Sequence, residues 1–174
     1  MLQITVRRLR KLWAGAKIFV TTSNPEAMKF YCPGVISVVC ANEWLRDRFL
    51  LGKLHHALPT RVSRLVVRWQ HSLWQRTPGL MSSATWLKLI FLRQKAGDFR
   101  TLLKTLRGAD LVVACGAGGL GDQFPAYSST FLTVLGIATR SAQATAMFSH
   151  GFCPMENPDL LSRCGSVLPK LSLI

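Results

Sequence analysis

The stretch Ala109–Phe124, ADLVVACGAGGLGDQF, decides the fold that we expect for this chain. Within it, Leu111–Cys115 is a short apolar run rich in β-branched residues, which predicts a buried strand. The glycines that follow are Gly116, Gly118, Gly119 and Gly121. Asp122 comes next as the expected N-cap of a helix that continues to about Ala138. A strand that passes through a glycine turn into a helix is how α/β sheets build ligand sites at the carboxyl ends of their strands.

The glycine loop suits an anionic ligand. Glycine lets the backbone adopt positive φ and approach a bound group, and the helix N-terminus offers N–H groups and a positive dipole end. Gly116–Gly121 matches the pattern GxGxxG, but a dinucleotide site needs an acidic residue about 20 positions further on. The next acid after Asp122 is Glu156, which lies well past the following strand. We therefore favour a substrate site for phosphate or carboxylate, formed by Gly116, Gly118, Gly119 and Asp122, with a purely structural turn as the alternative.

Apolar runs and helical patterns alternate along the rest of the chain. Strands are predicted at Lys17–Thr22, Gly34–Cys40, Leu111–Cys115 and Ala144–Ser149, with a fifth beginning in Leu168–Ile174. Helices are predicted at Leu2–Trp13, from Pro25 to about Tyr31, and at Arg61–Arg76, Trp86–Lys95, Phe99–Arg107 and Phe124–Ala138, with one more starting at Asn157. This alternation predicts a parallel sheet with helices on both faces, in one Rossmann-like α/β domain over residues 1–174. Because the chain opens inside a helix and ends on a strand, we expect an incomplete piece of a larger α/β protein.

The charge is strongly positive, with a formal net value of +14. Residues 43–108, which we expect to be a basic helical region, hold 13 Lys and Arg against three acids. The basic residues alternate with Leu, Val and Trp, as they do in amphipathic helices whose charged face is solvated. We favour this interpretation over a surface that binds nucleic acid or an anionic membrane. No apolar run reaches the roughly 18–20 residues of a membrane span. The five cysteines show no metal-ligand spacing, so we expect buried thiols, no metal site and a cytoplasmic protein.

Two more loops follow predicted strands and add candidate site residues. Ser23 and Asn24 come directly after the first strand and precede Pro25, so one of them should cap the next helix. His150 and Gly151 follow the strand at Ala144–Ser149. Because an unperturbed histidine has a pKa of about 6.5, His150 is the candidate catalytic acid, base or hydrogen-bond donor. Ser23, Asn24 and Gly151 are candidate substrate-binding residues. The alternative for His150 is a purely structural role, in which its ring hydrogen-bonds to a backbone group.

The order of these motifs resembles the N-terminal half of the polysaccharide pyruvyl transferase family. The segments that carry the resemblance are TTSNPE, YCPGV, ADLVVACGAGGLGDQF and MFSHGFCPM. Gly116–Asp122 resembles the family's glycine-rich stretch, and Gly151–Pro154 resembles its later glycine loop, with His150 in the preceding place. The resemblance implies a GT-B-like pair of Rossmann-type domains and transfer of a pyruvyl group from phosphoenolpyruvate to a sugar of a cell-surface polysaccharide. Phosphoenolpyruvate and a sugar acceptor are then the implied partners, and no cofactor is implied.

The same resemblance places further parts of the enzyme outside residues 1–174. The family's opening strand would precede Leu2, and its second domain, with the residues taken to hold phosphoenolpyruvate, would follow Ile174. We therefore expect the isolated chain to be an inactive fragment. Two other functions stay open: a GT-B glycosyltransferase fragment that uses a nucleotide sugar, and a basic module that binds nucleic acid or a membrane surface.

Overall fold

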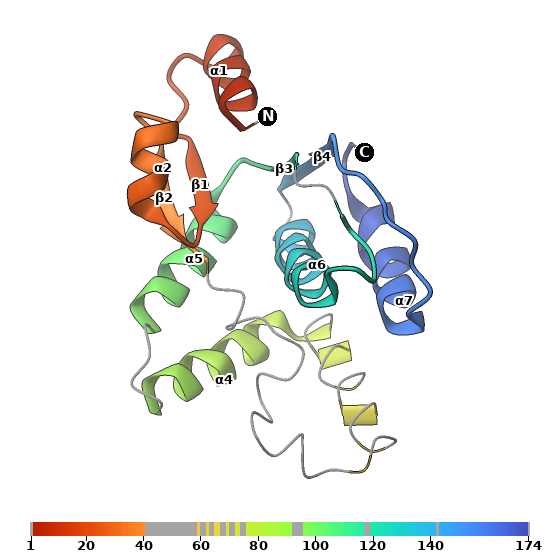
Figure 1. Ribbon diagram of the computed structural model, residues 1–174. Helices are drawn as coiled ribbons and strands as arrows, with labels where there is room; N and C mark the ends of the chain where they lie inside the picture. The colour runs from red at the N-terminus through yellow and green to blue at the C-terminus, as the bar shows by residue number, and fades with distance from the viewer. Residues whose placement is uncertain are drawn as a thin grey trace.

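The computed structural model describes residues 2–40, 59, 62, 65–66, 69, 72–73, 76–91, 96–116, 119–141 and 143–173. The strands are β1 Phe19–Thr22, β2 Ile36–Val39, β3 Leu111–Cys115 and β4 Ala144–Phe148. The helices are α1 Leu2–Leu12, α2 Pro25–Tyr31, α4 Pro78–Phe91, α5 Ala96–Gly108, α6 Pro125–Arg140, α7 Pro158–Val167 and the 3-10 helix η3 Leu168–Lys170. The protein is therefore mixed α/β, and the strand pairs in its described part are parallel, as predicted (Figure 1).

The strands form two small sheets where we expected one. β1 pairs with β2, and β3 pairs with β4, with Phe19 opposite Ile36 and Leu111 opposite Ala144. Among the described residues no ladder joins the two sheets. Figure 1 shows β2, β1, β3 and β4 in that order across the molecule.

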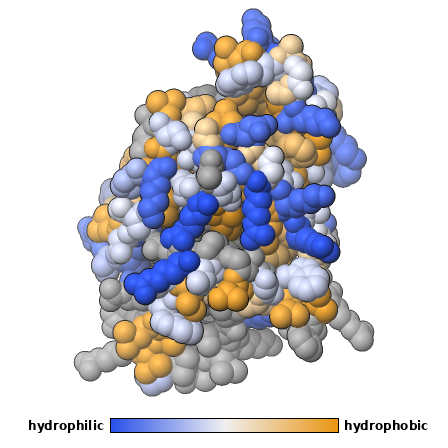
Figure 2. Space-filling model, turned by 180° about the vertical axis from the view of Figure 1, so that it is seen from behind, coloured by the Kyte–Doolittle hydropathy of each residue, from blue (hydrophilic) through white to orange (hydrophobic). Residues whose placement is uncertain are grey.

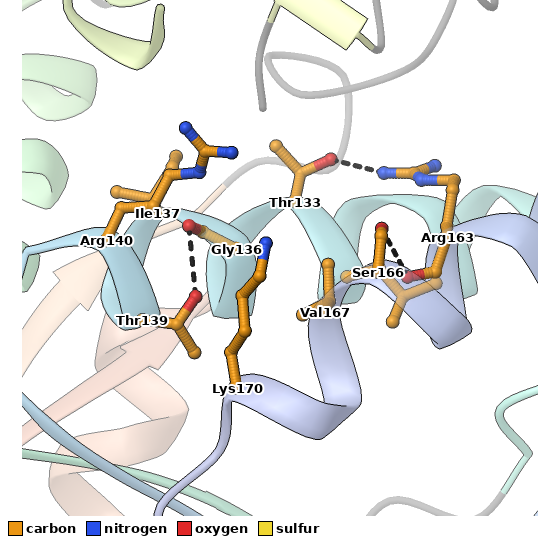
Figure 3. Close-up of a pocket in the computed structure, with 10 residues that line it drawn as sticks. Thr133, Gly136, Ile137, Thr139, Arg140, Arg163, Ser166, Val167 and Lys170 are labelled. Carbon is orange, nitrogen blue, oxygen red and sulfur yellow. Dashed lines mark hydrogen bonds between the residues drawn. The ribbon is translucent and has the colours of Figure 1, made fainter. Parts of the chain in front are cut away.

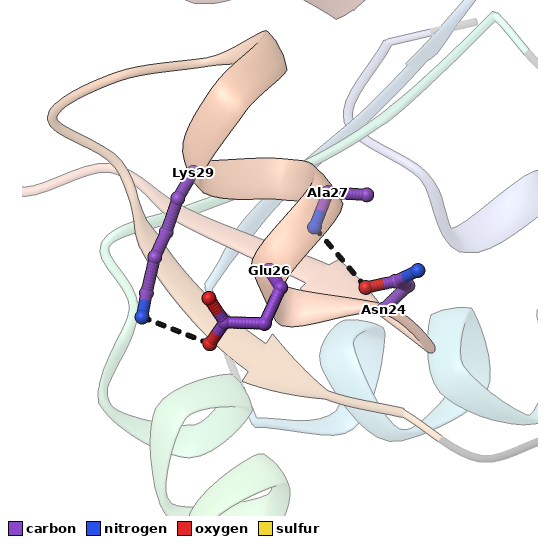
Figure 4. A network of polar contacts seen from close by, with 4 residues as sticks. All are labelled: Asn24, Glu26, Ala27 and Lys29. Atoms are coloured by element: carbon purple, nitrogen blue, oxygen red, sulfur yellow. Dashed lines mark hydrogen bonds and ion pairs between the residues drawn. The ribbon is translucent and has the colours of Figure 1, made fainter.

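Local signals set the helix boundaries. The Asn24 side chain accepts a hydrogen bond of 3.1 Å from the Ala27 amide, so Asn24 is the N-cap of α2 and Pro25 occupies its first turn, as predicted. On the exposed side of α2, Lys29 forms an ion pair of 3.0 Å with Glu26 (Figure 4). Such an exposed pair contributes little to stability. Asn157 caps α7 in the same way, through the amides of Asp159 and Leu160.

The expected fifth strand is mostly absent, which corrects the prediction for Leu168–Ile174. Its first three residues form η3, which contains Pro169, a residue that lacks a backbone donor. Beyond η3, Leu173 makes an isolated parallel bridge to Ala146. Its carbonyl accepts a hydrogen bond of 2.9 Å from the Met147 amide. The strand is thereby reduced to Ser172 and Leu173, which bond to Thr145 and Met147 on the outer side of β4.

A shared helix layer connects the two sheets. One buried cluster contains Val38 of β2 together with Leu102 and Leu106 of α5, and Val112 of β3 packs against the same cluster. α5 therefore packs on β2, and β3 borders the same cluster through Val112. On the opposite face of the first sheet, Val20 packs with Val6 of α1 and with Cys32, which follows α2. The first sheet thus has helices on both faces.

Part of the basic region lies outside the described residues, including most of the predicted helix Arg61–Arg76. Of the part that is described, α4 begins at Pro78, before the predicted start at Trp86, and α5 extends the predicted helix Phe99–Arg107 at both ends. Figure 2 shows hydrophilic side chains over the upper and middle parts of one face, with hydrophobic side chains between them. None of the described helices combines the length and the apolar character needed to cross a bilayer.

Candidate anion site at the ends of β3 and β4

The loops that follow β3 and β4 are bound to each other. The carbonyl of Gly151 accepts hydrogen bonds from the amides of Gly119, at 3.3 Å, and Leu120, at 3.2 Å. In return, the Cys153 amide donates to the carbonyl of Leu120 at 3.1 Å, and Leu120 and Phe152 form a parallel bridge. We call residues 119–122 and 150–154 together the loop pair. Two of the predicted site glycines, Gly119 and Gly151, therefore lie side by side.

Glycine is required in the loop pair for two separate reasons. Gly119 in the loop pair, and Gly116 just before it, have φ values of 98° and 64°, which side-chain-bearing residues rarely adopt. Gly121 has an ordinary φ but no free space, because a Cβ there would lie 2.7 Å from the Cβ of Cys153 and 3.0 Å from its carbonyl oxygen. The glycines thus allow the two loops to pack closely, which is the structural role left open by the sequence.

Asp122 does not cap the helix that follows it, which corrects the prediction. Pro125 is the first residue of α6, so the N-cap position falls on Phe124, whose side chain makes no capping hydrogen bond. The Asp122 carboxylate instead accepts hydrogen bonds from the amides of Glu156, at 2.6 Å, and Asn157, at 2.9 Å. Asp122 therefore joins the first loop to the segment that enters α7.

His150 is held over the first two turns of α6. The residue before it, Ser149, has a φ of 56°, the one positive value at a non-glycine position in the described chain. The His150 ring lies 4.6 Å from the ring of Phe131, which in turn stacks on Tyr127 at 5.8 Å. Burial raises the pKa of Tyr127 above its ordinary value. A strained backbone angle next to a positioned histidine is typical of a functional site.

The amides of the loop pair are largely used inside the protein. Besides Gly119 and Leu120, the Gly121 amide donates to the Ser128 hydroxyl and the Asp122 amide donates to the Pro154 carbonyl. The first amide to bond within α6 is that of Ser128, to the Phe124 carbonyl, so Ala126 and Tyr127 present their amides at the helix N-terminus. An anion would therefore meet the first turn of α6 and His150, and would not meet the amides of Gly119–Asp122.

The other predicted site residues lie elsewhere. Ser23 and Asn24 follow β1 in the other sheet, where both side chains are exposed. The Asn24 side-chain oxygen caps α2, and its amide bonds to the Thr22 hydroxyl at 3.0 Å. The structure thus brings together Gly119, Asp122, His150 and Gly151, and it does not join Ser23 or Asn24 to them. Gly118 falls outside the described residues.

A pocket that no sequence motif predicted lies between α6 and α7 (Figure 3). Arg140, Arg163 and Lys170 are among its lining residues. Arg163 is 5% exposed and donates to the Ser129 carbonyl at 2.8 Å, to the Thr133 hydroxyl at 2.7 Å and to the Ser129 hydroxyl. An arginine on an amphipathic helix normally predicts an exposed side chain, so its burial could not be expected from its position.

The five cysteines are free, with Cys32 buried and the other four half-buried. Burial raises the pKa of Cys40 and of Cys164, which favours the unreactive thiol form. No group of three or more His, Cys, Asp or Glu in the described ranges is placed to hold a metal ion.

Comparison of the chain with protein-family models, with curated proteins and with solved structures gives no match.

Proposed function

We propose that this chain is a Rossmann-like N-terminal unit of a pyruvyl transferase-like protein and that His150 and the first turn of α6, held in place by the loop pair, bind the anionic substrate. The observation that carries this proposal is the direct bonding of the loops after β3 and β4, with the His150 ring packed on Phe131 in the second turn of α6. Ligand sites in open α/β sheets lie at the carboxyl ends of strands, where these loops are.

The proposed substrate is phosphoenolpyruvate, which carries a phosphate and a carboxylate. The N-terminus of α6 suits one anionic group, because its first amides and its dipole both favour negative charge. His150 can donate a hydrogen bond to a second anionic group or deliver a proton, since the pKa of an unperturbed histidine is about 6.5. Transfer of an enolpyruvyl-derived group requires protonation of the enol carbon, and His150 is the residue proposed for that step. The acceptor would be a sugar hydroxyl.

Calorimetric titration of the full chain with phosphoenolpyruvate tests the proposal. We expect binding that is at least about tenfold weaker in His150→Gln, because a hydrogen bond to a charged group contributes about 1.5–3 kcal/mol. Lys170→Gln is the matched control, since Lys170 lies in the pocket between α6 and α7, where it would bind an anion at the competing site. Loss of binding in Lys170→Gln with full binding in His150→Gln would refute the proposed site.

The identity of the bound ligand distinguishes the proposed function from the glycosyltransferase alternative. A chain of that class would bind a nucleotide sugar such as UDP-glucose and would not discriminate phosphoenolpyruvate from inorganic phosphate. We expect the opposite preference. Binding of UDP-glucose that His150→Gln abolishes would move the assignment to that class.

A further inference from the structure

α1 is attached to the rest of the protein by one face. Val6 packs against Val20 of β1. The side chains of Gln3 and Arg10 donate to backbone carbonyls at the C-terminal end of α2 and just beyond it, at 2.7 Å and 2.8 Å. Residues 3, 6 and 10 have the spacing of a single helix face. A helix of 11 residues is marginal on its own, so these contacts hold α1 in place.

The opposite face of α1 carries exposed side chains, both apolar and basic. Ile4, Arg8, Lys11 and Leu12 have the i, i+4, i+7, i+8 spacing of one helix face, and we call them the outer stripe. Ile4 and Leu12 are 58% and 69% exposed, and Trp13, directly after the helix, is 51% exposed. Figure 1 shows α1 at one end of the molecule, beyond β1 and α2, and Figure 2 shows hydrophilic and hydrophobic side chains next to each other at that end.

The cations around the outer stripe have no acidic neighbour in the sequence. Residues 2–18 contain no Asp or Glu and five cations, which are Arg7, Arg8, Arg10, Lys11 and Lys17. The first acid of the chain is Glu26, and it is paired with Lys29. Within the described part of the chain, none of the five cations forms an ion pair. The surface of α1 therefore presents uncompensated positive charge beside exposed apolar side chains.

The remaining residues of this chain do not supply the missing negative charge. The residues outside the described ranges include eight Lys and Arg but only two acids, Glu43 and Asp47. Their own excess charge is positive, so they repel the cations of α1. An occupant with complementary charge is therefore anionic and comes from outside residues 1–174.

We propose that the outer stripe and Trp13 bind the surface of an anionic lipid bilayer, with α1 lying in the plane of the headgroups. The long stems of the two cations lie beside the apolar side chains of the stripe, while their charged ends reach the lipid phosphates. Ile4 and Leu12 are stabilised by entering the acyl boundary, and Trp13 suits the headgroup level, where aromatic residues concentrate. This inference does not depend on the proposed function, and it concerns a different segment from the basic region 43–108.

The apolar members of the outer stripe favour a bilayer over a nucleic acid. The phosphates of a nucleic acid attract the cations but offer no apolar partner to Ile4 and Leu12. In a bilayer the acyl chains lie directly beneath the charged headgroups, so both kinds of side chain in the stripe find a partner at once.

The test measures co-sedimentation of the full chain with vesicles made of equal parts phosphatidylglycerol and phosphatidylcholine. We expect Arg8→Gln/Lys11→Gln to bind at least about tenfold more weakly, because each cation near an anionic membrane surface adds to the attraction. Leu12→Gln should bind at least about threefold more weakly, because it removes an inserted apolar side chain. Vesicles of phosphatidylcholine alone should bind the parent chain only weakly, and added salt should release it from the mixed vesicles.

Matched substitutions on other helices separate this site from the general positive charge of the protein. Arg100→Gln/Lys104→Gln removes the same number of charges from the exposed face of α5. Leu161→Gln removes a leucine of α7 that is 50% exposed. Both controls should bind the mixed vesicles within about twofold of the parent chain, because exposed charges far from the membrane are screened.

Four results would overturn the proposal. They are absence of binding, equal binding to pure phosphatidylcholine vesicles, unchanged binding of Leu12→Gln, and equal losses in the α1 variants and the controls. Tighter binding to DNA that depends on Arg8 and Lys11 but not on Leu12 would also overturn it and identify a nucleic acid as the ligand. Circular dichroism checks the folding of each variant. Should the double variant not fold, Lys11→Gln alone, compared with Lys104→Gln, decides the contribution of charge.

Discussion

At the scale of single residues, the geometry of the loop pair shows which of its positions require glycine. Gly119 needs its positive φ, whereas Gly121 needs the absence of a Cβ against Cys153. Gly151 belongs to the same loops, yet a Cβ there would meet no atom within 4 Å. Three glycines in one small region therefore differ sharply in what they contribute to stability.

This difference gives a prediction for stability. Gly121→Ala should lower the free energy of unfolding by about 2–3 kcal/mol, because the added Cβ overpacks against backbone and Cβ atoms that cannot turn aside. Gly151→Ala should change it by less than about 1 kcal/mol, since its surroundings are open. Urea unfolding followed by circular dichroism measures both. Equal effects of the two substitutions would contradict the packing of the loops.

Asp122 shows the limit of what can be predicted from local sequence. Its place after a glycine run predicted an N-cap, but its carboxylate bonds to the amides of Glu156 and Asn157, 34 and 35 residues further along the chain. Local patterns detect caps because a cap's partner lies within three residues. A partner contributed by another loop depends on the tertiary fold and leaves no local pattern.

At the scale of elements, the predictions were best where the signal was local. β3 begins and ends at the predicted residues, because its apolar run lies between a polar residue and a glycine. α2 and α7 start where Asn-Pro pairs predicted. The strand predicted in Leu168–Ile174 was largely wrong, since apolar content alone did not distinguish a strand from the 3-10 turn that Pro169 occupies.

The pairing of α6 with α7 depends on Arg163. Its guanidinium joins two residues of α6, Ser129 and Thr133, from within the interface. Arg163→Met should cost about 3 kcal/mol of unfolding free energy, because it removes three buried hydrogen bonds from a charged donor. Arg140→Met, at the exposed end of α6, should change it by less than about 0.5 kcal/mol. Thermal unfolding of the two variants makes the comparison, and a loss in Arg140→Met as large as in Arg163→Met would argue against this role.

At the scale of the whole molecule, the sequence predicted the parallel α/β class but not the division into two sheets. Strand pairing depends on which edges meet in space, and the apolar run of β3 predicts an interior strand whether or not a neighbour is present. The same holds for the candidate site. Gly119 and Gly151 could be placed near each other from the rule that carboxyl ends of parallel strands meet, whereas Ser23 and Asn24 belong to the other sheet.

The central claim is that His150, positioned by the loops after β3 and β4, and the first turn of α6 act as one site for an anionic substrate. The most direct measurement is a titration of the ¹⁵N-labelled chain with phosphoenolpyruvate, followed by backbone amide shifts. We predict that the amides of His150–Phe152 and of the first turn of α6 shift together with a single dissociation constant. Shifts confined to the pocket residues Arg140, Arg163 and Lys170, or to the basic helix α1, would contradict the account.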